Sequence, residues 1–173
     1  MPESYRPVLV VDREKKRTVT QTVKTNVNNN TPTVQLVLDH NGRRIVTIRP
    51  EETLGRAVEV LRDNNIGALV VTDGAGALKG ILSERDIVRK LADAPGKTLP
   101  HRVEQIMTEN VQTCTAEESL IDVLRRMSKG HFRHMPVVDG KGVVGMVTIG
   151  DVINHRLRQL EHETLQLKQL VVG

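Results

Sequence analysis

Two segments decide the fold: Gly80-Ile-Leu-Ser-Glu-Arg-Asp86 and Gly145-Met-Val-Thr-Ile-Gly-Asp151. Each places a glycine in an apolar run, ends the run with a hydroxyl residue, and continues to an aspartate three residues after that hydroxyl. The two segments lie 65 residues apart, since 145 − 80 = 65. A pattern that recurs in the same order at a fixed distance indicates an internal duplication.

The duplication continues upstream of both segments, where the separation is 66 residues, since 113 − 47 = 66. Identical residues recur there in the same order, and one residue drops out before the glycine that opens each segment. The matched pairs include Thr47 with Thr113, Glu51 with Glu117, Leu54 with Leu120, Asp73 with Asp139 and Gly74 with Gly140. The chain therefore contains two copies of one unit, at about residues 43–92 and 109–158.

Both copies predict the same order of secondary structure. Apolar residues recur at helical spacing after Thr53 and after Ser119, and both of these residues suit the N-cap position. Two β-rich runs follow in each copy, separated by the turn signals Asp73-Gly74 and Asp139-Gly140, and a second helix starts near the aspartate of each quoted segment. Each copy reads β-α-β-β-α, an α+β pattern. Because about 50 residues bury too little surface alone, the two copies are expected to pack as one unit.

The remaining stretches divide the chain into four parts. Residues 1–32 are polar and rich in Thr and Asn, so a poorly ordered extension is expected there. Residues 33–98 are assigned to the first unit with a leading helix, residues 99–158 to the second unit, and residues 159–173 to an extension of its last helix.

That last helix carries a spaced set of residues along its length. They step by four and three, which approximates a heptad. The positions are Ile153, Leu157, Leu160, Thr164, Leu167 and Val171. Either these residues form a seam with another helix, or the helix lies on its own domain.

Composition excludes several classes of protein. The 173 residues are 38% apolar and 27% charged, and no run approaches the ~18 apolar residues of a spanning helix, so a soluble chain is expected. The first residues do not have the pattern of a signal peptide, which makes the cytoplasm the expected location. With no Trp, one Tyr and one Phe, the chain lacks aromatic platforms for unpaired bases. Nucleic-acid binding through the net charge of +4 is therefore the least favoured function, and it would predict an affinity that falls steeply with salt.

The repeated hydroxyl-x-x-Asp pattern has two interpretations. In the first, the hydroxyl and the carboxylate cap the helix that follows and do nothing else. In the second, the same groups and the free backbone N–H groups bind an anion or a polyol, and the carboxylate accepts both hydroxyls of a ribose. Recurrence of the pattern in both copies leaves the two interpretations near parity.

The ordered and duplicated set of motifs resembles a tandem cystathionine-β-synthase (CBS) domain pair, the Bateman module, of the stand-alone type. The resemblance covers about residues 33–158 and includes Gly67-Ala-Leu-Val-Val-Thr-Asp73 and Arg133-His-Met-Pro-Val-Val-Asp139. It implies two pseudo-symmetric β-α-β-β-α units packed sheet to sheet. It also implies a non-catalytic module that binds adenosine compounds in two clefts between the units, signals energy or redox state to an unknown partner, and pairs as a homodimer. The alternative is a structural or interaction homodimer with vestigial clefts.

The resemblance assigns residues to a first cleft, in which an aspartate holds the ribose and basic residues hold the phosphate. These residues are Ser83, Arg85, Asp86, Thr113, Arg133, His134, Met135 and Pro136. An Arg and a His suit a phosphate because both donate hydrogen bonds, although both could also be solvated surface residues. They favour AMP and NAD(H), with ATP possible, over S-adenosylmethionine, which carries a positive sulfonium and no phosphate.

A second cleft follows from the same resemblance, with the roles of the two copies exchanged. Its residues are Thr148, Gly150, Asp151, Thr47, Ile48, Gly67, Ala68 and Leu69. Gly67-Ala68 stands where the first cleft has Arg133-His134, so this strand offers no comparable grip on a phosphate. The second cleft is either a weaker site or one with room for a larger, less charged part of a ligand, such as a nicotinamide.

Other reactive residues do not form a recognisable catalytic set. The single cysteine, Cys114, allows neither an intrachain disulfide nor a cysteine zinc cage. Its combination with His131 and His134 has irregular spacing and is more typical of a buried cysteine beside solvent-facing or phosphate-facing histidines than of a metal site. No orienting partner for a cysteine nucleophile is evident. Neither an enzyme nor a bound metal is therefore expected.

Overall fold

The computed structural model describes residues 31–42 and 45–172 of the chain. The predicted extension over residues 1–32 lies almost entirely outside this described part. The predicted α+β class is confirmed, and the order of elements follows the repeat. The elements are α1 (Val34–Asn41), β1 (Thr47–Ile48), α2 (Leu54–Asn64), β2 (Ala68–Thr72), β3 (Leu78–Ser83), α3 (Glu84–Asp93), the 3-10 helix η1 (Val103–Gln105), α4 (Leu120–Gly130), β4 (His134–Asp139), β5 (Gly142–Thr148) and α5 (Ile149–Val172).

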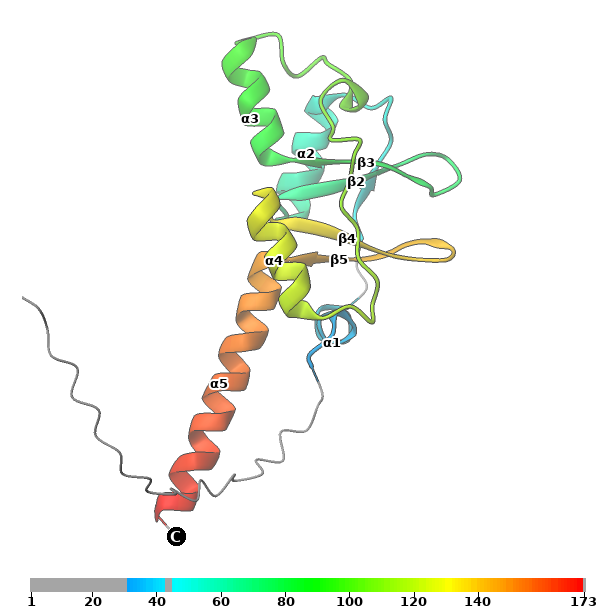
Figure 1. Ribbon diagram of the computed structural model, residues 1–173. Helices are drawn as coiled ribbons and strands as arrows, with labels where there is room; N and C mark the ends of the chain where they lie inside the picture. Colours follow the sequence, from blue (N-terminus) through cyan, green and yellow to red (C-terminus); the bar gives the residue numbers. More distant parts are fainter. Residues whose placement is uncertain (1–30, 43–44, 173) are drawn as a thin grey trace, which may run out of the picture. The chain divides into compact units, whose positions relative to one another are not determined.

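Each copy forms its own small sheet (Figure 1). In the first copy β1 pairs parallel with β2, and β2 pairs antiparallel with β3. In the second copy β4 pairs antiparallel with β5. The strand predicted to open the second copy is reduced to one parallel bridge, between Cys114 and Val137. The backbone turns away directly after this bridge, because the N–H of Thr115 donates to the Glu118 carboxylate at 2.9 Å.

The two sheets contact each other at both ends of their hairpins. At one end, a Cβ placed on Gly67 would lie 3.5 Å from the ring of His134. At the other end, a Cβ on Gly142 would lie 3.7 Å from the carbonyl oxygen of Gly76. Val70, in the middle of β2, is fully buried. The predicted packing of two pseudo-symmetric units, sheet to sheet, is thereby confirmed.

The predicted helix caps are confirmed in both copies. The hydroxyl of Thr53 accepts a hydrogen bond from the N–H of Arg56 at 3.2 Å, and the hydroxyl of Ser119 accepts one from the N–H of Ile121 at 3.3 Å. Such caps stabilise a helix by about 1 kcal/mol each. They fix the start of α2 and α4, whose apolar faces then pack onto the two sheets.

The segments that precede the two copies are exchanged between them. Sequence order groups α1 with the first copy, but Val34 and Leu38 of α1 are buried in the core of the second copy. The N–H of Val34 also donates to the carbonyl of Glu118 at 2.9 Å. Conversely, Val103 of η1 is buried in the core of the first copy, and its N–H donates to the carbonyl of Glu52 at 2.8 Å. The helix that leads the first unit in the sequence therefore buries its apolar face in the core of the second copy.

The exchange explains why both copies have a glycine at the equivalent position, Gly80 and Gly145. A Cβ on Gly80 would lie 2.7 Å from the sulfur of Met107 and 2.9 Å from the carbonyl oxygen of Thr108. A Cβ on Gly145 would lie 2.4 Å from a methyl carbon of Leu38 in α1. The missing side chain at each glycine thus leaves room for the segment that precedes the other copy: the linker at Gly80 and α1 at Gly145. At Gly80 this brings the linker onto the edge of β3, where Ile81 and Thr108 exchange backbone hydrogen bonds of 3.0 and 2.9 Å.

Candidate functional site

The first hydroxyl-x-x-Asp motif forms a complete capping box at the start of α3. Oδ2 of Asp86 accepts hydrogen bonds from the N–H of Ser83 at 2.9 Å and from its hydroxyl at 2.6 Å. The Ser83 hydroxyl in turn accepts from the N–H of Asp86 at 3.4 Å. Among the described residues, Oδ1 of Asp86 accepts no hydrogen bond. The capping interpretation is therefore correct, and it leaves one carboxylate oxygen available, held in a fixed orientation by the other.

The second motif has the same box but no free oxygen. Oδ2 of Asp151 accepts from the N–H of Thr148 at 2.8 Å and from its hydroxyl at 2.7 Å. Oδ1 accepts from the side-chain amide of Asn41 at 2.7 Å. Asn41 is the last residue of α1, the helix that the exchange brings to the second copy. The two aspartates therefore have the same local geometry and differ in whether a ligand would find an open acceptor.

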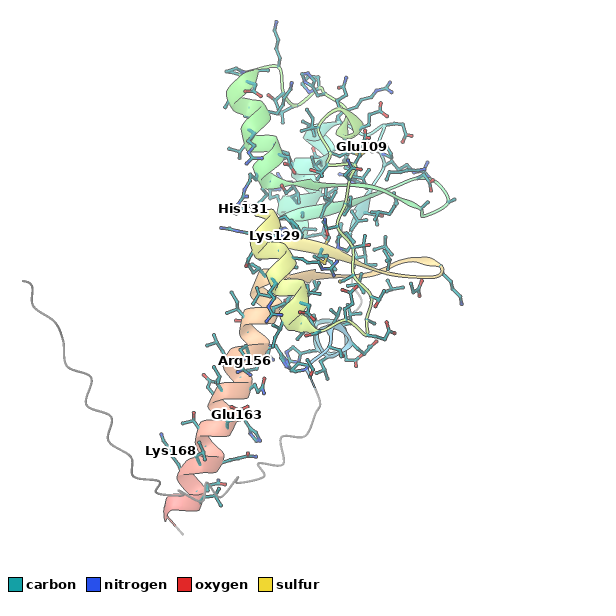
Figure 2. All side chains as sticks on the ribbon, viewed as in Figure 1. Glu109, Lys129, His131, Arg156, Glu163 and Lys168 are labelled. Atoms are coloured by element: carbon teal, nitrogen blue, oxygen red, sulfur yellow. The ribbon has the colours of Figure 1, made fainter. Side chains whose placement is uncertain are left out.

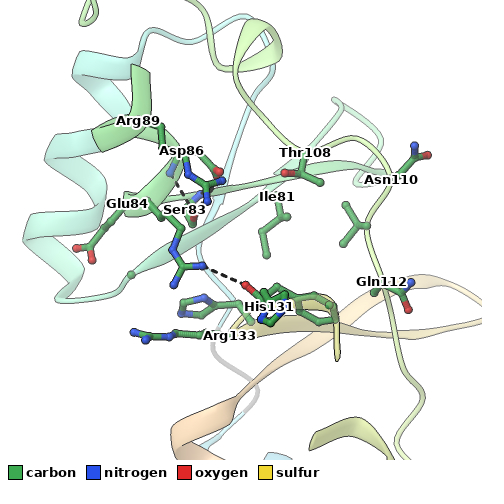
Figure 3. A pocket seen from close by; sticks show the side chains of 16 residues that line it. Ile81, Ser83, Glu84, Asp86, Arg89, Thr108, Asn110, Gln112, His131 and Arg133 are labelled. Atoms are coloured by element: carbon green, nitrogen blue, oxygen red, sulfur yellow. Dashed lines mark hydrogen bonds between the residues drawn. The ribbon is translucent and has the colours of Figure 1, made fainter. Parts of the chain in front are cut away.

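A cavity of about 540 Å³ opens beside Asp86, between the two copies (Figure 3). This volume lies within the range of roughly 300–1,000 Å³ that is usual for ligand pockets. One side is formed by the end of β3 and the start of α3, and the opposite side by the loop from α4 into β4. The linker between the copies passes along a third side. The lining residues are Gly67, Ile81, Ser83, Glu84, Arg85, Asp86, Arg89, Thr108, Asn110, Val111, Gln112, Gly130, His131, Phe132, Arg133 and His134.

Three arginines line this cavity, and their hydrogen bonding differs. Arg85 donates from Nη1 to the carbonyl of His131 at 3.1 Å, which ties α3 to the second copy (Figure 3). Arg89 and Arg133 make no hydrogen bond or ion pair with any described residue. Figure 3 shows Arg89 next to Asp86 and Arg133 across the cavity from them. Two guanidinium groups are thus free to bind an anion, for which their planar fork of donors is suited.

His134 adds a titratable group to the same cavity. Burial lowers the pKa of His134, while the nearby carboxylates of Asp151 and Glu84 oppose this and Arg133 adds to it. Burial of the imidazole therefore favours its neutral form. A neutral imidazole still has one N–H to donate, and an anion placed beside it would favour the charged form.

The structure brings together only part of the predicted first-cleft set. Ser83, Arg85, Asp86, Arg133 and His134 all line the cavity. The other three predicted residues do not line it, and they are Met135, Pro136 and Thr113.

The alternation of strand β4 explains the exclusion of Met135. His134 points to the cavity, whereas the side chain of Met135 turns into the second core and is fully buried. Pro136 is also buried. Thr113 instead offers its carbonyl to Arg126 at 2.9 Å. A resemblance that carries over a whole strand start thus overestimates the number of side chains that can face a ligand.

Sequence reasoning missed several lining residues. Arg89 lies one helical turn after Arg85 and could have been found from that spacing on the capped helix. The linker residues Asn110 and Gln112 carried no such signal, because their position depends on the contact of the linker with Gly80. His131 enters the cavity because it ends α4 in a left-handed conformation with φ of 55°.

Most of the predicted second-cleft set lies elsewhere. Gly67 lines the first cavity, and Asp151 lines a separate cavity of about 450 Å³ between α1 and α5. The remaining members, which line neither of these two cavities, are Thr47, Ile48, Ala68, Leu69, Thr148 and Gly150. Ala68 and Leu69 are buried in the β2 strand. Their side chains pack in the protein interior.

The single cysteine, Cys114, is buried and unreactive. Cys114 is 1% exposed, and burial raises the pKa of its thiol to about 12. A thiol with so high a pKa is a poor nucleophile at neutral pH. Within residues 31–42 and 45–172, no cluster of three or more His, Cys, Asp and Glu side chains is arranged to hold a metal ion. No helix in this part of the chain has the length and apolar character needed to cross a membrane.

Several known proteins are similar to this chain in sequence and in fold. A protein from Arabidopsis thaliana, the mitochondrial CBS domain-containing protein CBSX3, is 34% identical over 127 residues, which are 71% of this chain and 62% of that protein. The crystal structure of a CBS-domain-containing protein from Agrobacterium tumefaciens is 37% identical with a TM-score of 0.71, and the match covers 72% of this chain and 99% of that one.

A further solved structure is the CBS domain pair of protein MJ0100 in complex with 5′-methylthioadenosine and S-adenosyl-L-methionine. It is 30% identical, has a TM-score of 0.66, and the match covers 75% of this chain and 98% of that one. The family model of the CBS domain matches residues 37–93 and 103–158, one match for each copy. With two matched domains and this fold, the chain belongs to the CBS domain family.

Proposed function

We propose that this chain is a non-catalytic regulatory module that binds a phosphorylated adenosine compound in the cavity beside Asp86. AMP and NAD(H) fit best, and ATP is a third candidate. The observation that carries the proposal is the combination of one open carboxylate oxygen on Asp86 with two unpartnered guanidinium groups, those of Arg89 and Arg133, in the same cavity.

The carboxylate of Asp86 suits a ribose. Its Oδ2 is held by two hydrogen bonds from Ser83, so Oδ1 is oriented before any ligand arrives. A carboxylate oxygen is an acceptor only, and it can accept from the hydroxyls of a ribose. Preorganisation of this kind lowers the entropic cost of binding. The capping role and the binding role of Asp86 therefore support each other.

The cationic side of the cavity suits a phosphate. Arg89 and Arg133 each offer a planar fork of guanidinium donors, and His134 adds a further donor. A cationic sulfonium would be repelled by the same two groups, which favours AMP or NAD(H) over S-adenosylmethionine. The MJ0100 complex supports the adenosine part of this proposal, since its two ligands share that moiety. The choice of a phosphorylated ligand depends on the residues of this chain.

We propose that the second cleft, around Asp151, binds a ligand only when Asn41 moves away. A ribose can use Oδ1 of Asp151 only after Asn41 has released it, because the two groups are 2.7 Å apart. We therefore expect the first cavity to bind its ligand more tightly than the second.

Regulation requires more than binding. CBS domains are in general regulatory modules without catalytic activity. For a nucleotide to signal, the protein must exist in two states with different affinities for that nucleotide, and a regulated partner must distinguish them. Arg85 joins α3 of the first copy to His131 of the second across the cavity, so a ligand that moves one copy against the other would change this contact.

Thermal melts on nucleotide-free protein test the proposal. AMP, ATP, NAD, NADH, S-adenosylmethionine and 5′-methylthioadenosine are compared, and a ligand at ~100 times its Kd adds about 2.7 kcal/mol to the free energy of unfolding. The stabilisation should be largest for a phosphorylated compound, should be lost in Asp86→Asn, and should persist in the matched control Asp151→Asn. If no compound raises the Tm, the protein is instead a structural or interaction homodimer with vestigial clefts.

A further inference from the structure

The last helix carries a long apolar stripe that the described part of the chain leaves largely exposed. All side chains from residue 161 to residue 170 are exposed, although α5 continues to Val172. Most of the stability of a helix in a protein comes from the packing of its apolar face. Among the described residues nothing buries the side chains of these final turns, so a partner that covers the stripe would stabilise them.

The stripe follows a heptad repeat. Ile153, Leu160 and Leu167 occupy d positions, and Leu157 and Thr164 occupy a positions, when Leu157 is assigned to a. The four apolar members are 44–63% exposed. Thr164 at a and Leu167 at d combine a β-branched residue at a with leucine at d, which is the pattern that favours two strands in a parallel coiled coil.

The opposite face of α5 is the one that its own chain covers. The cavity between α1 and α5 is lined by His155, Arg158, Gln159 and His162 of α5, which occupy positions f, b, c and f of the same heptad. These positions lie away from the a and d stripe. The helix therefore contacts its own domain on one side and presents the stripe on the other.

The charges beside the stripe select a parallel pair of identical helices. In a parallel pair, position g of one helix faces position e of the next heptad on the other. Arg156 then faces Glu161 of the second copy, and Glu163 faces Lys168, so both contacts join opposite charges, each occurring twice by symmetry. Figure 2 shows Arg156, Glu163 and Lys168 in succession along α5.

An antiparallel pair centred on the same stripe would be disfavoured. Positions g and e would then face their own equivalents, which places Glu163 opposite Glu163 and Glu161 opposite Glu161. Within the described residues, none of these charged side chains forms an ion pair with another part of its own chain. In that part of the chain, Arg156 and Glu163 hydrogen-bond only within α5, each to the side-chain amide of Gln159 at 2.9 Å, and both contacts are exposed to solvent.

We propose that two copies of this chain associate through α5 as a parallel, two-stranded coiled coil, with Leu160 and Leu167 in its core and Glu163 paired with Lys168 across it. This inference is independent of the nucleotide site. It identifies the surface, the orientation and the register of a dimer.

Sedimentation equilibrium of the full chain tests the surface. The wild type should be a dimer, and Leu160→Asp/Leu167→Asp should raise the dimer Kd by at least 100-fold. Leu165→Asp is the matched control, since Leu165 is 58% exposed, close to the 63% of Leu167, but lies outside the stripe. A monomeric wild type, a trimer or larger assembly, or a dimer that survives the double substitution would overturn the proposal.

Charge reversal and a cysteine link test the orientation. Glu163→Lys should weaken the dimer roughly 2- to 30-fold at low salt, and the added Lys168→Glu should restore it. Oxidised Leu160→Cys should form a disulfide with its own equivalent, whereas Leu165→Cys should not. These outcomes do not depend on the folding of the Asp variants. Crosslinking through position 165 alone, or no recovery in the charge-swapped protein, would contradict the parallel register.

Discussion

Replacement of Gly80 by alanine should destabilise the protein more than the same replacement at Gly145. At Gly80 the new Cβ would meet the sulfur of Met107 at 2.7 Å and the backbone carbonyl of Thr108 at 2.9 Å. The linker must then move outward by about half an ångström or more, which strains the two hydrogen bonds between Ile81 and Thr108. Overpacking of this kind costs about 1–3 kcal/mol, and each weakened hydrogen bond adds up to about 1 kcal/mol.

Two effects make the free-energy loss smaller, one at both glycines and one at Gly145 alone. Alanine lowers the entropy of the unfolded chain, which returns about 0.4–1 kcal/mol at either position. At Gly145 the clash is with one terminal methyl carbon of Leu38, and the next nearest atom is 3.6 Å away. A side-chain rotation relieves most of it, at about 0.5–1.5 kcal/mol. The expected net loss is therefore about 2 kcal/mol for Gly80→Ala and below about 1 kcal/mol for Gly145→Ala.

Urea denaturation followed by circular dichroism measures both losses, and nucleotide titration of the same proteins adds a functional readout. Because the displaced linker carries Asn110 and Gln112 into the cavity wall, Gly80→Ala should also weaken binding. Equal stability losses, or a larger loss for Gly145→Ala, would refute the argument that the linker backbone, rather than a flexible side chain, requires the glycine.

Three further outcomes follow from the structure. Asn41→Ala should tighten AMP binding at the weaker, second site, because it frees Oδ1 of Asp151; calorimetry with Gln35→Ala as the control on the same helix measures the affinity of each site, and an unchanged second affinity, or two sites of equal affinity in the wild type, would contradict it. The pKa of His134 lies below its ordinary value of 6.5 in the folded state, so the stability that the neutral imidazole contributes is present above pH 6.5 and is lost as the pH falls through the folded pKa. A phosphate beside it reverses this preference, so melts should show a larger AMP-induced rise in Tm at pH 6 than at pH 8, and His134→Gln should abolish the difference. Cys114 should react with a thiol reagent at pH 7.5 only on unfolding, and rapid labelling of the native protein would be inconsistent with its burial and raised pKa.

Much of the fold was predictable because the same sequence pattern occurs in both copies. The caps at Thr53 and Ser119, the two hairpins and the two capped aspartates all follow from local chemistry that recurs in both copies. The exchange of α1 was not predictable, since sequence order says nothing about which of two similar cores a short apolar helix enters. As a consequence of this exchange, Asn41 donates a hydrogen bond to Oδ1 of Asp151. The two repeated aspartates therefore differ, although the repeat implies that they are equivalent.

The site was predictable only where side chains act locally. Ser83 and Asp86 were found because a capping box is a short-range pattern, whereas Arg133 and His134 were assigned through the resemblance to the CBS family. Met135 was predicted to contact the ligand, but strand alternation turns its side chain into the core. The linker wall at residues 108–112 depends on a long-range contact, which no spacing in the sequence reveals.

A crystal structure of the nucleotide-free protein soaked with AMP tests the central claim most directly. AMP is expected between the two copies, with a ribose hydroxyl on Oδ1 of Asp86 and the phosphate within reach of Arg89 or Arg133. Adenosine bound at Asp151 with the first cavity empty, or a phosphate directed away from both arginines, would contradict it.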